Sequence, residues 1–152
     1  MADVNMCLAE NGGTLGTGAN ENDRNYWNEA HYISVNPGSS SFTAQIDFPS
    51  CTVSKALWLV AGTGSGASTS RNYYLYLNID GSWTQVKTHS DSGIGTWYYD
   101  WPDGETVTGP WEKVTGIKYY VTVYSPIGVS RGYGYGLQAW GSAIIGGFAF
   151  IL

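Results

Sequence analysis

The sequence predicts an all-β domain folded as a sandwich or jelly roll. Bulky apolar side chains alternate with polar ones in several short runs, and a period of two residues is typical of half-buried strands. Turn-forming residues separate these runs at intervals of roughly 8–12 residues, a spacing typical of sandwiches and barrels. No long stretch keeps the period of an amphipathic helix.

Three runs show this alternation clearly. Their apolar positions are Phe42, Ala44, Ile46 and Phe48; Tyr73, Leu75, Leu77 and Ile79; and Ile117, Tyr119, Val121 and Val123. Because successive strand residues point to opposite faces, we expect these side chains to form the core. On the opposite faces lie Asn72, Tyr74, Tyr76, Asn78, Lys118 and Tyr120. The run 56–61 is apolar on both faces, which predicts a central strand.

Turn signals divide the runs. Asp80-Gly81, between residues 73–79 and 83–87, predicts a tight two-residue hairpin. Other predicted breaks are Asn36-Pro37-Gly38, Pro102-Asp103-Gly104, Gly109-Pro110 and residues 125–128. The glycine-rich segment 62–70 predicts a flexible β-connection. It lacks the following helix and the lysine that a phosphate-binding loop requires.

The composition restricts the kinds of partner that the protein is expected to bind. Charged residues make up 12% of the chain, so its polar surface must come largely from hydroxyl and amide side chains, which suit sugars and tightly packed neighbours. The net charge is -5 with only 7 Lys plus Arg, which argues against binding nucleic acid or an anionic membrane. The longest apolar stretch, 143–152, is interrupted by glycines and is too short to span a bilayer.

We expect one sandwich domain over residues 1–141, with a loop-rich part at 1–25, followed by an apolar tail at 142–152. The start of the chain lacks the pattern of a Sec-type signal peptide. The tail is expected either to fold back on its own sandwich or to pack on another chain. Its candidate oligomer contacts are Ile144, Ile145, Phe148, Phe150 and Leu152.

Three segments resemble the discoidin, or F5/8 type C, group of galactose-binding-like domains. They are 22–27, with an acidic residue before a tryptophan; 74–86, a hairpin with Asp-Gly at its turn; and 116–121 followed by 135–141, two closing strands. The resemblance implies a jelly roll of about eight antiparallel strands and a role in adhesion, commonly to glycans. The chain departs from the family at Gln138, where glutamate is usual, and has no cysteine after Cys51. Cys7 and Cys51 are interpreted as buried small residues, with a single disulfide as the alternative.

The candidate ligand-binding residues are aromatic. Trp97, Tyr98, Tyr99 and Trp101 form a dense cluster, and Tyr26 belongs to the first resembling segment. Aromatic faces pack against sugars and also anchor protein interfaces, so glycan contact and subunit contact are both open for them. Glu21 and Asp23 are candidate calcium ligands, since similar domains sometimes hold calcium, although a plain polar loop is preferred. We expect no other cofactor.

No arrangement of residues predicts catalysis. A Gly-x-Ser-x-Gly motif is absent, and the two histidines, His31 and His89, are interpreted as solvent or turn residues. Acidic residues that a glycoside hydrolase would require as a pair are interpreted instead as turn formers. These are Asp91, Asp100, Asp103 and Glu105.

Two functions follow from these expectations. The first is a non-enzymatic structural subunit that forms a homo-oligomer or larger assembly on a virion surface, such as a phage-type decoration, fibre or tail protein. The few charges, many aromatics and apolar tail favour it. The alternative is a free-standing, extracellular, lectin-like carbohydrate-binding module, which the resemblance favours. The two are compatible, because a virion subunit can itself bind glycans.

Overall fold

The computed structural model describes residues 31–99, 107–145 and 148–150 and three two-residue strands near the N-terminus. All its regular elements are strands, and every pairing is antiparallel, which confirms the all-β prediction. The strands are β1 (Val4–Asn5), β2 (Thr14–Leu15), β3 (Asn20–Glu21), β4 (His31–Val35), β5 (Gly38–Gly64), β6 (Ser70–Ile79), β7 (Ser82–Ser92), β8 (Gly95–Tyr99), β9 (Val107–Ser125), β10 (Ser130–Ile145) and β11 (Phe148–Phe150).

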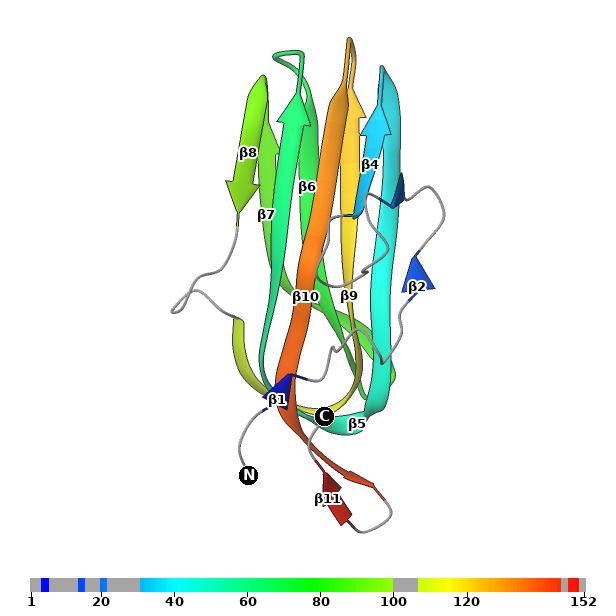
Figure 1. Cartoon of the computed structure of the whole chain (residues 1–152), viewed down its shortest axis with the longest axis vertical. Coiled ribbons are helices and arrows are strands. Elements are labelled where there is room, and N and C mark those ends of the chain that lie inside the picture. Colours follow the sequence, from blue (N-terminus) through cyan, green and yellow to red (C-terminus); the bar gives the residue numbers. More distant parts are fainter. Residues whose placement is uncertain are drawn as a thin grey trace.

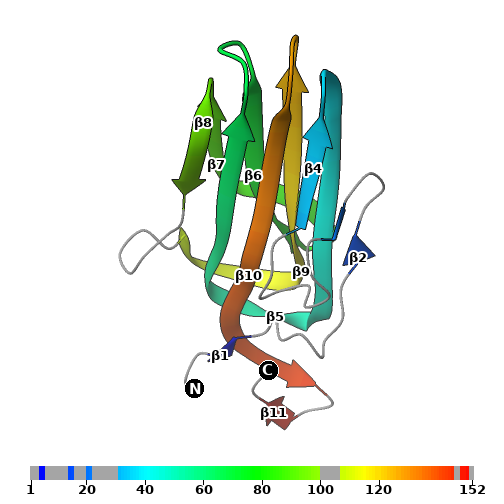
Figure 2. The same ribbon diagram turned by 45° about the horizontal axis from the view of Figure 1, so that its top comes forward.

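The strands form two layers (Figures 1 and 2). We call the first layer sheet 1; it contains residues 38–47 of β5, residues 116–125 of β9, and then β6 and β7. Sheet 2 contains β4, residues 130–135 of β10, residues 60–64 of β5, and β8. This arrangement confirms the predicted β-sandwich.

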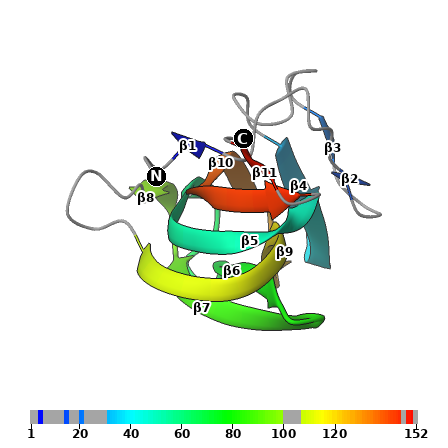
Figure 3. The same cartoon turned by 90° about the horizontal axis from the view of Figure 1, so that it is seen from below.

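The long strands β5, β9 and β10 bend across one end of the sandwich and join the two layers (Figure 3). The prediction of separate strands at 42–48 and 56–61 was wrong, because β5 is continuous. Pro49 lies where the register between β5 and β9 shifts, after Asp47. A proline removes one ladder hydrogen bond, which a β-bulge tolerates. The predicted break at Gly109-Pro110 was also wrong, because β9 is continuous there. This proline too lies at a register shift between β5 and β9.

Other turn predictions were confirmed in whole or in part. Asp80 and Gly81 have positive φ angles of 51° and 84° and connect β6 to β7, as a tight hairpin requires. β9 ends at Ser125, within the predicted break, and the Ser125 hydroxyl lies 2.8 Å from the carbonyl oxygen of Gly128. The predicted connection at 62–70 is shorter than expected, because β5 continues to Gly64 and β6 begins at Ser70.

The core lies between the two sheets. All the predicted inward side chains are buried except Ile79, which is partly buried. Sheet 2 contributes Ile33 and Val60 to this core, but β10 faces the aromatic side chains with glycine. A Cβ atom at Gly134 of β10 would lie 2.5 Å from Cε2 of Tyr119, and the Tyr119 hydroxyl donates a hydrogen bond to the carbonyl of Gly134 at 3.1 Å. Glycine on β10 therefore makes room for the aromatic side chains of sheet 1.

Cys51 lies in the region where β5 bends between the sheets. Its thiol donates to the carbonyl oxygen of Val114, with 3.6 Å between sulfur and oxygen. Burial raises the pKa of this thiol to about 11. The expectation that Cys51 is a small buried residue is confirmed, whereas Cys7 lies outside the described residues.

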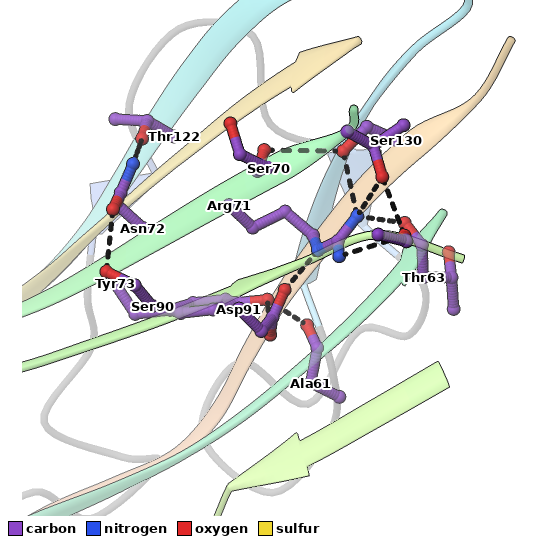
Figure 4. Close-up of polar contacts among 12 residues, drawn as sticks. Ala61, Thr63, Ser70, Arg71, Asn72, Tyr73, Ser90, Asp91, Thr122 and Ser130 are labelled. Atoms are coloured by element: carbon purple, nitrogen blue, oxygen red, sulfur yellow. Dashed lines mark hydrogen bonds and ion pairs between the residues drawn. The ribbon is translucent and has the colours of Figure 1, made fainter. Parts of the chain in front are cut away.

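A buried ion pair joins the sheets at the opposite end (Figure 4). Arg71 of β6 is fully buried, and its Nε bonds the carboxylate of Asp91 on β7. Its Nη1 donates to the carbonyl of Thr63 on β5 at 2.8 Å and lies 3.2 Å from the hydroxyl of Ser130 on β10. One cation on β6 therefore contacts three other strands, and its charge is compensated by a single carboxylate.

Tyr73 extends the same network. Its hydroxyl lies 2.9 Å from the carbonyl oxygen of Ala61 and 3.0 Å from Oδ2 of Asp91. Burial raises the pKa of Tyr73, and the negative charge of Asp91 raises it further. Gly62 leaves space for these groups, since a Cβ there would lie 2.6 Å from Nε of Arg71.

The network corrects two interpretations. Asp91 lies in strand β7 and not in a turn, and it pairs with a buried cation. His89 also lies in β7, where its ring stacks on Tyr73 with centroids 5.8 Å apart. Burial lowers the pKa of His89. His31 is part of β4.

The C-terminal tail begins inside a strand. β10 runs past residue 141 to Ile145, and Ala143, Ile144 and Ile145 pair with Phe150, Ala149 and Phe148 of β11. This hairpin extends beyond the sandwich at the lower end of Figure 1. Leu152 lies outside the described residues. No helix in the described part of the chain is long and apolar enough to cross a membrane.

We predict that Gly134→Ala destabilises the protein by about 1–3 kcal/mol, because the added methyl overpacks the core against Tyr119. Urea unfolding followed by tryptophan fluorescence measures the change. The control Ser68→Ala alters an exposed loop residue and should stay within about 0.5 kcal/mol of the wild type. Equal stability of all three proteins would contradict the close approach of the sheets.

We predict that Asp91→Asn lowers the free energy of unfolding by about 3–5 kcal/mol, since it leaves the charge of Arg71 buried and unpaired. The same urea titration at neutral pH tests it. Asp80→Asn is the matched control, because Asp80 is exposed and asparagine tolerates a positive φ. A loss no larger than that of the control would show that the ion pair does not hold this end together.

Candidate functional site

The predicted site residues fall in different places. Trp97, Tyr98 and Tyr99 lie in β8, where their backbones pair with Gly62, Ala61 and Val60 of β5. Glu21 lies in β3 and pairs with His31. Tyr26, Asp23 and Trp101 lie outside the described residues. Glycan, subunit and calcium contacts at these positions stay predictions.

A different group of aromatic residues gathers on the outer face of sheet 1. Tyr74 of β6 lies opposite Tyr120 of β9, and Tyr76 lies opposite Lys118 one row further along. Trp83 of β7 pairs with Asn78 and so shares this face. We call this surface the aromatic face; its aromatic members are Tyr74, Tyr76, Trp83, Tyr120 and Tyr124. Tyr124 is 47% exposed and the others are half-buried.

The rings form a connected row. The centroids of Tyr74 and Tyr120 are 5.8 Å apart with planes inclined at 30°, and those of Tyr74 and Tyr76 are 6.4 Å apart at 36°. The ammonium group of Lys118 lies 4.4 Å from the centroid of a Trp83 ring and 5.2 Å from that of Tyr76. Lys118 therefore links the tyrosines to the tryptophan by cation–π contacts.

Burial beside these rings lowers the pKa of Lys118. Loss of water around the ammonium is the only cause of this shift. A partly desolvated ammonium donates hydrogen bonds to a ligand oxygen with less competition from solvent.

Amide and hydroxyl groups surround the rings. The Gln45 amide donates to the Asp47 carboxylate at 3.3 Å, in the rows that contain Lys118 and Gly116. At the other end, the Asn72 amide donates to Thr122 at 3.4 Å (Figure 4). This face thus combines flat apolar surfaces with amide, hydroxyl and carboxylate groups.

The side chain of Trp83 on β7 packs on Gly116 of β9. A Cβ at Gly116 would be 3.1 Å from Cη2 of Trp83, so the bare backbone of β9 accommodates the indole. The side-chain oxygen of Asn78, in the same row, is enclosed and has no hydrogen-bond partner among the described residues. The tryptophan therefore holds its place by packing on a glycine, which favours a preformed surface.

The sequence carried only part of the signal for this face. Tyr74, Tyr76 and Tyr120 were recognised as lying opposite the core positions of their strands. Their association depends on β6 and β9 being neighbours in a particular register, which alternation within one strand does not specify. The site was predicted at 97–101 because the aromatic residues there are close together in the sequence.

No family model matches the chain, and no curated protein matches it. Among solved structures, CBM28, a non-crystalline cellulose specific carbohydrate-binding module, is similar over 88% of this chain and 89% of its own, with 9% identity and a TM-score of 0.51. TmCBM61, solved with β-1,4-galactotriose, covers 92% of this chain and 87% of its own, at 14% identity and a TM-score of 0.43.

Bacteriophage CBA120 tailspike protein 4 is similar over 92% of this chain but 18% of its own chain, with 12% identity and a TM-score of 0.40. At identities this low, structural similarity speaks for the fold and not for a ligand. The match to CBM28 agrees with the two antiparallel sheets described above. The chain is thus a β-sandwich with the architecture of that module.

Proposed function

We propose that this protein is a non-catalytic carbohydrate-binding protein and that a glycan chain lies along its aromatic face. The observation that carries the proposal is the row formed by Tyr120, Tyr74, Tyr76, Lys118 and Trp83 on one rigid sheet. The C–H-rich faces of sugar rings pack against aromatic rings, while their hydroxyl groups need amide, hydroxyl or ammonium partners. This face supplies both.

The aromatic face is not an extension of the core. Core positions on the same strands, such as Leu75, Leu77 and Tyr119, are fully buried on the other side of sheet 1. Aromatic residues gathered on an outer face commonly mark an interaction surface. Their functional assignment therefore accounts for side chains that packing within the described structure does not require.

The ring geometry favours a single glycan chain over a flat polysaccharide surface. Inclinations of 30° and 36° between neighbouring rings prevent them from lying in one plane. A chain whose successive sugars turn relative to one another can follow such a row. CBM28, which has a similar fold, is specific for non-crystalline cellulose and supports this choice by analogy alone.

We propose no catalytic role. Asp91 is one of the carboxylates that a paired-carboxylate mechanism could have used. Its side chain is bonded to Arg71 in the buried network that joins the two sheets. Within the described ranges, histidine, cysteine and acidic side chains form no group of three or more that suits a metal ion. Calcium binding at Glu21 and Asp23 stays a prediction.

A second candidate function is assembly on a virion surface, through the C-terminal hairpin. Its support is the position of β10 and β11 beyond the sandwich, together with the apolar residues in that segment (Figure 1). The discoidin-like and virion assignments rest on the sequence. Glycan binding ranks first because the aromatic face is a surface of defined geometry.

We predict that Tyr74→Ala, Tyr120→Ala and Trp83→Ala each weaken glycan binding by about tenfold or more, as expected for central aromatic anchors. A glycan array identifies the best neutral ligand, and isothermal titration calorimetry measures its affinity for each variant. Ile94→Ala is the control, because Ile94 is an exposed apolar residue between β7 and β8, outside the aromatic face. Wild-type affinity in all three variants would overturn the site, provided that each melts as a folded protein.

We predict that the full-length protein forms a defined oligomer and that Phe148→Ser combined with Phe150→Ser converts it to a monomer. Both residues belong to the C-terminal hairpin, and the loss of two apolar contacts weakens an interface formed there. Native mass spectrometry gives the oligomeric state. A monomeric wild type, or an oligomer unaffected by the double substitution, would contradict assembly through this hairpin.

A further inference from the structure

A second cluster lies on the outer face of sheet 2, away from the aromatic face. Gly132 of β10 faces the core, since a Cβ there would lie 2.7 Å from Cγ1 of Val121. The flanking residues Arg131 and Tyr133 therefore point outward, and both are half-buried. Tyr133 pairs with Tyr32 of β4, which lies beside β10 in Figures 1 and 2.

The three side chains hold one another in place. Cζ of Arg131 lies 4.8 Å from the ring centroid of Tyr32, and Nη1 of Arg131 donates to the Tyr133 hydroxyl at 3.2 Å. The two tyrosine rings are 5.3 Å apart at an angle of 37°. A guanidinium group stacked on one ring and hydrogen-bonded to the next is oriented before any ligand arrives.

Among the described residues, no carboxylate forms a salt bridge with Arg131. Nε of Arg131 is enclosed and lacks a hydrogen-bond partner there. A guanidinium has five N–H donors, and an enclosed charged donor without a partner is costly. In a chain of net charge -5, a cation held in this way is suited to an external anion.

Residues with hydroxyl side chains lie opposite Arg131 on both neighbouring strands. Arg131 pairs with Ser34 on β4 and with Thr63 on β5, so the three side chains share one face. Ser34 and Thr63 are half-buried. The site thus offers a planar cation, two hydroxyls and two aromatic rings on neighbouring strands.

We propose that Arg131, Tyr32 and Tyr133 form a second binding site, which takes a sugar that carries a carboxylate, such as a uronic acid. The planar fork of a guanidinium matches a carboxylate and gives strong charge-assisted hydrogen bonds. The tyrosine rings receive the C–H face of the same sugar, and the hydroxyls of Ser34 and Thr63 reach its polar groups.

An acidic peptide fits this site less well. A glutamate or aspartate side chain presents one carboxylate on a flexible stem and has no hydroxyls to use Ser34 or Thr63. A sugar acid carries its carboxylate, hydroxyls and apolar face on one rigid ring, so less conformational entropy is lost on binding. The site lies on the sheet opposite the aromatic face, so the two proposals stand or fall separately.

The test titrates the full-length protein with tri-galacturonate and, in parallel, with neutral galactotriose. Calorimetry gives the affinities, and NMR chemical shifts of labelled protein locate the contacts. Binding of tri-galacturonate should shift the signals of Tyr32, Arg131 and Tyr133 and weaken as salt rises. Arg131→Gln should weaken it about tenfold or more, and Arg131→Lys by a smaller factor, because lysine keeps the charge but loses the fork.

Lys113→Gln serves as the control, because it removes an exposed cation that belongs to neither proposed site, and it should leave tri-galacturonate binding at the wild-type level. Thermal melting confirms that each variant is folded. The proposal fails if Arg131→Gln binds tri-galacturonate as tightly as the wild type, or if the shifted signals lie elsewhere. It also fails if galactotriose or a glutamate-rich peptide binds this cluster as tightly as tri-galacturonate.

Discussion

The spacing between the two sheets is the constraint on which this structure depends. Sheet 1 supplies the largest inward side chains, and sheet 2 faces them with Ile33, Val60 and the glycines of β5 and β10. The hydroxyls of Tyr119 and Tyr73 donate hydrogen bonds to the carbonyl oxygens of Gly134 and Ala61. The guanidinium of Arg71 donates to the carbonyl oxygen of Thr63. A hydrogen bond from a side chain to a facing strand has a short and narrow range of lengths, so these contacts set how closely the layers approach. Bulk on one side and glycine on the other make that approach possible.

The same constraint produces the aromatic face. Strands β6 and β9 must point Leu75 and Tyr119 into the core, and alternation then sends Tyr74 and Tyr120 outward on the same rigid strands. Anchors built on a packed sheet keep their positions better than anchors on loops. The core and the proposed glycan surface are two faces of one set of strands, which links the stability of the protein to the geometry of its site.

The two outer faces differ in the chemistry that they offer. Sheet 1 presents tilted rings with amides and a partly desolvated ammonium, which suits neutral sugar hydroxyls. Sheet 2 presents a guanidinium that lies over the Tyr32 ring and donates to the Tyr133 hydroxyl, without a described carboxylate partner. Arg71 shows the contrasting case, since its charge is buried and matched by Asp91 within the fold. Internal pairing therefore separates the structural role of Arg71 from the binding role that we propose for Arg131.

The sequence by itself determined the buried faces of the strands, because alternation is a local property: alternate residues from Phe42 to Phe48 and from Ile117 to Val123 are buried as predicted. It also determined the hairpin at Asp80-Gly81, whose backbone angles few residue pairs adopt. Only the tertiary structure decided that β5 continues through Pro49, and that Tyr74 lies beside Tyr120 and Arg131 beside Tyr32. These relations depend on which distant strands pair and in which register, and no local pattern encodes that pairing.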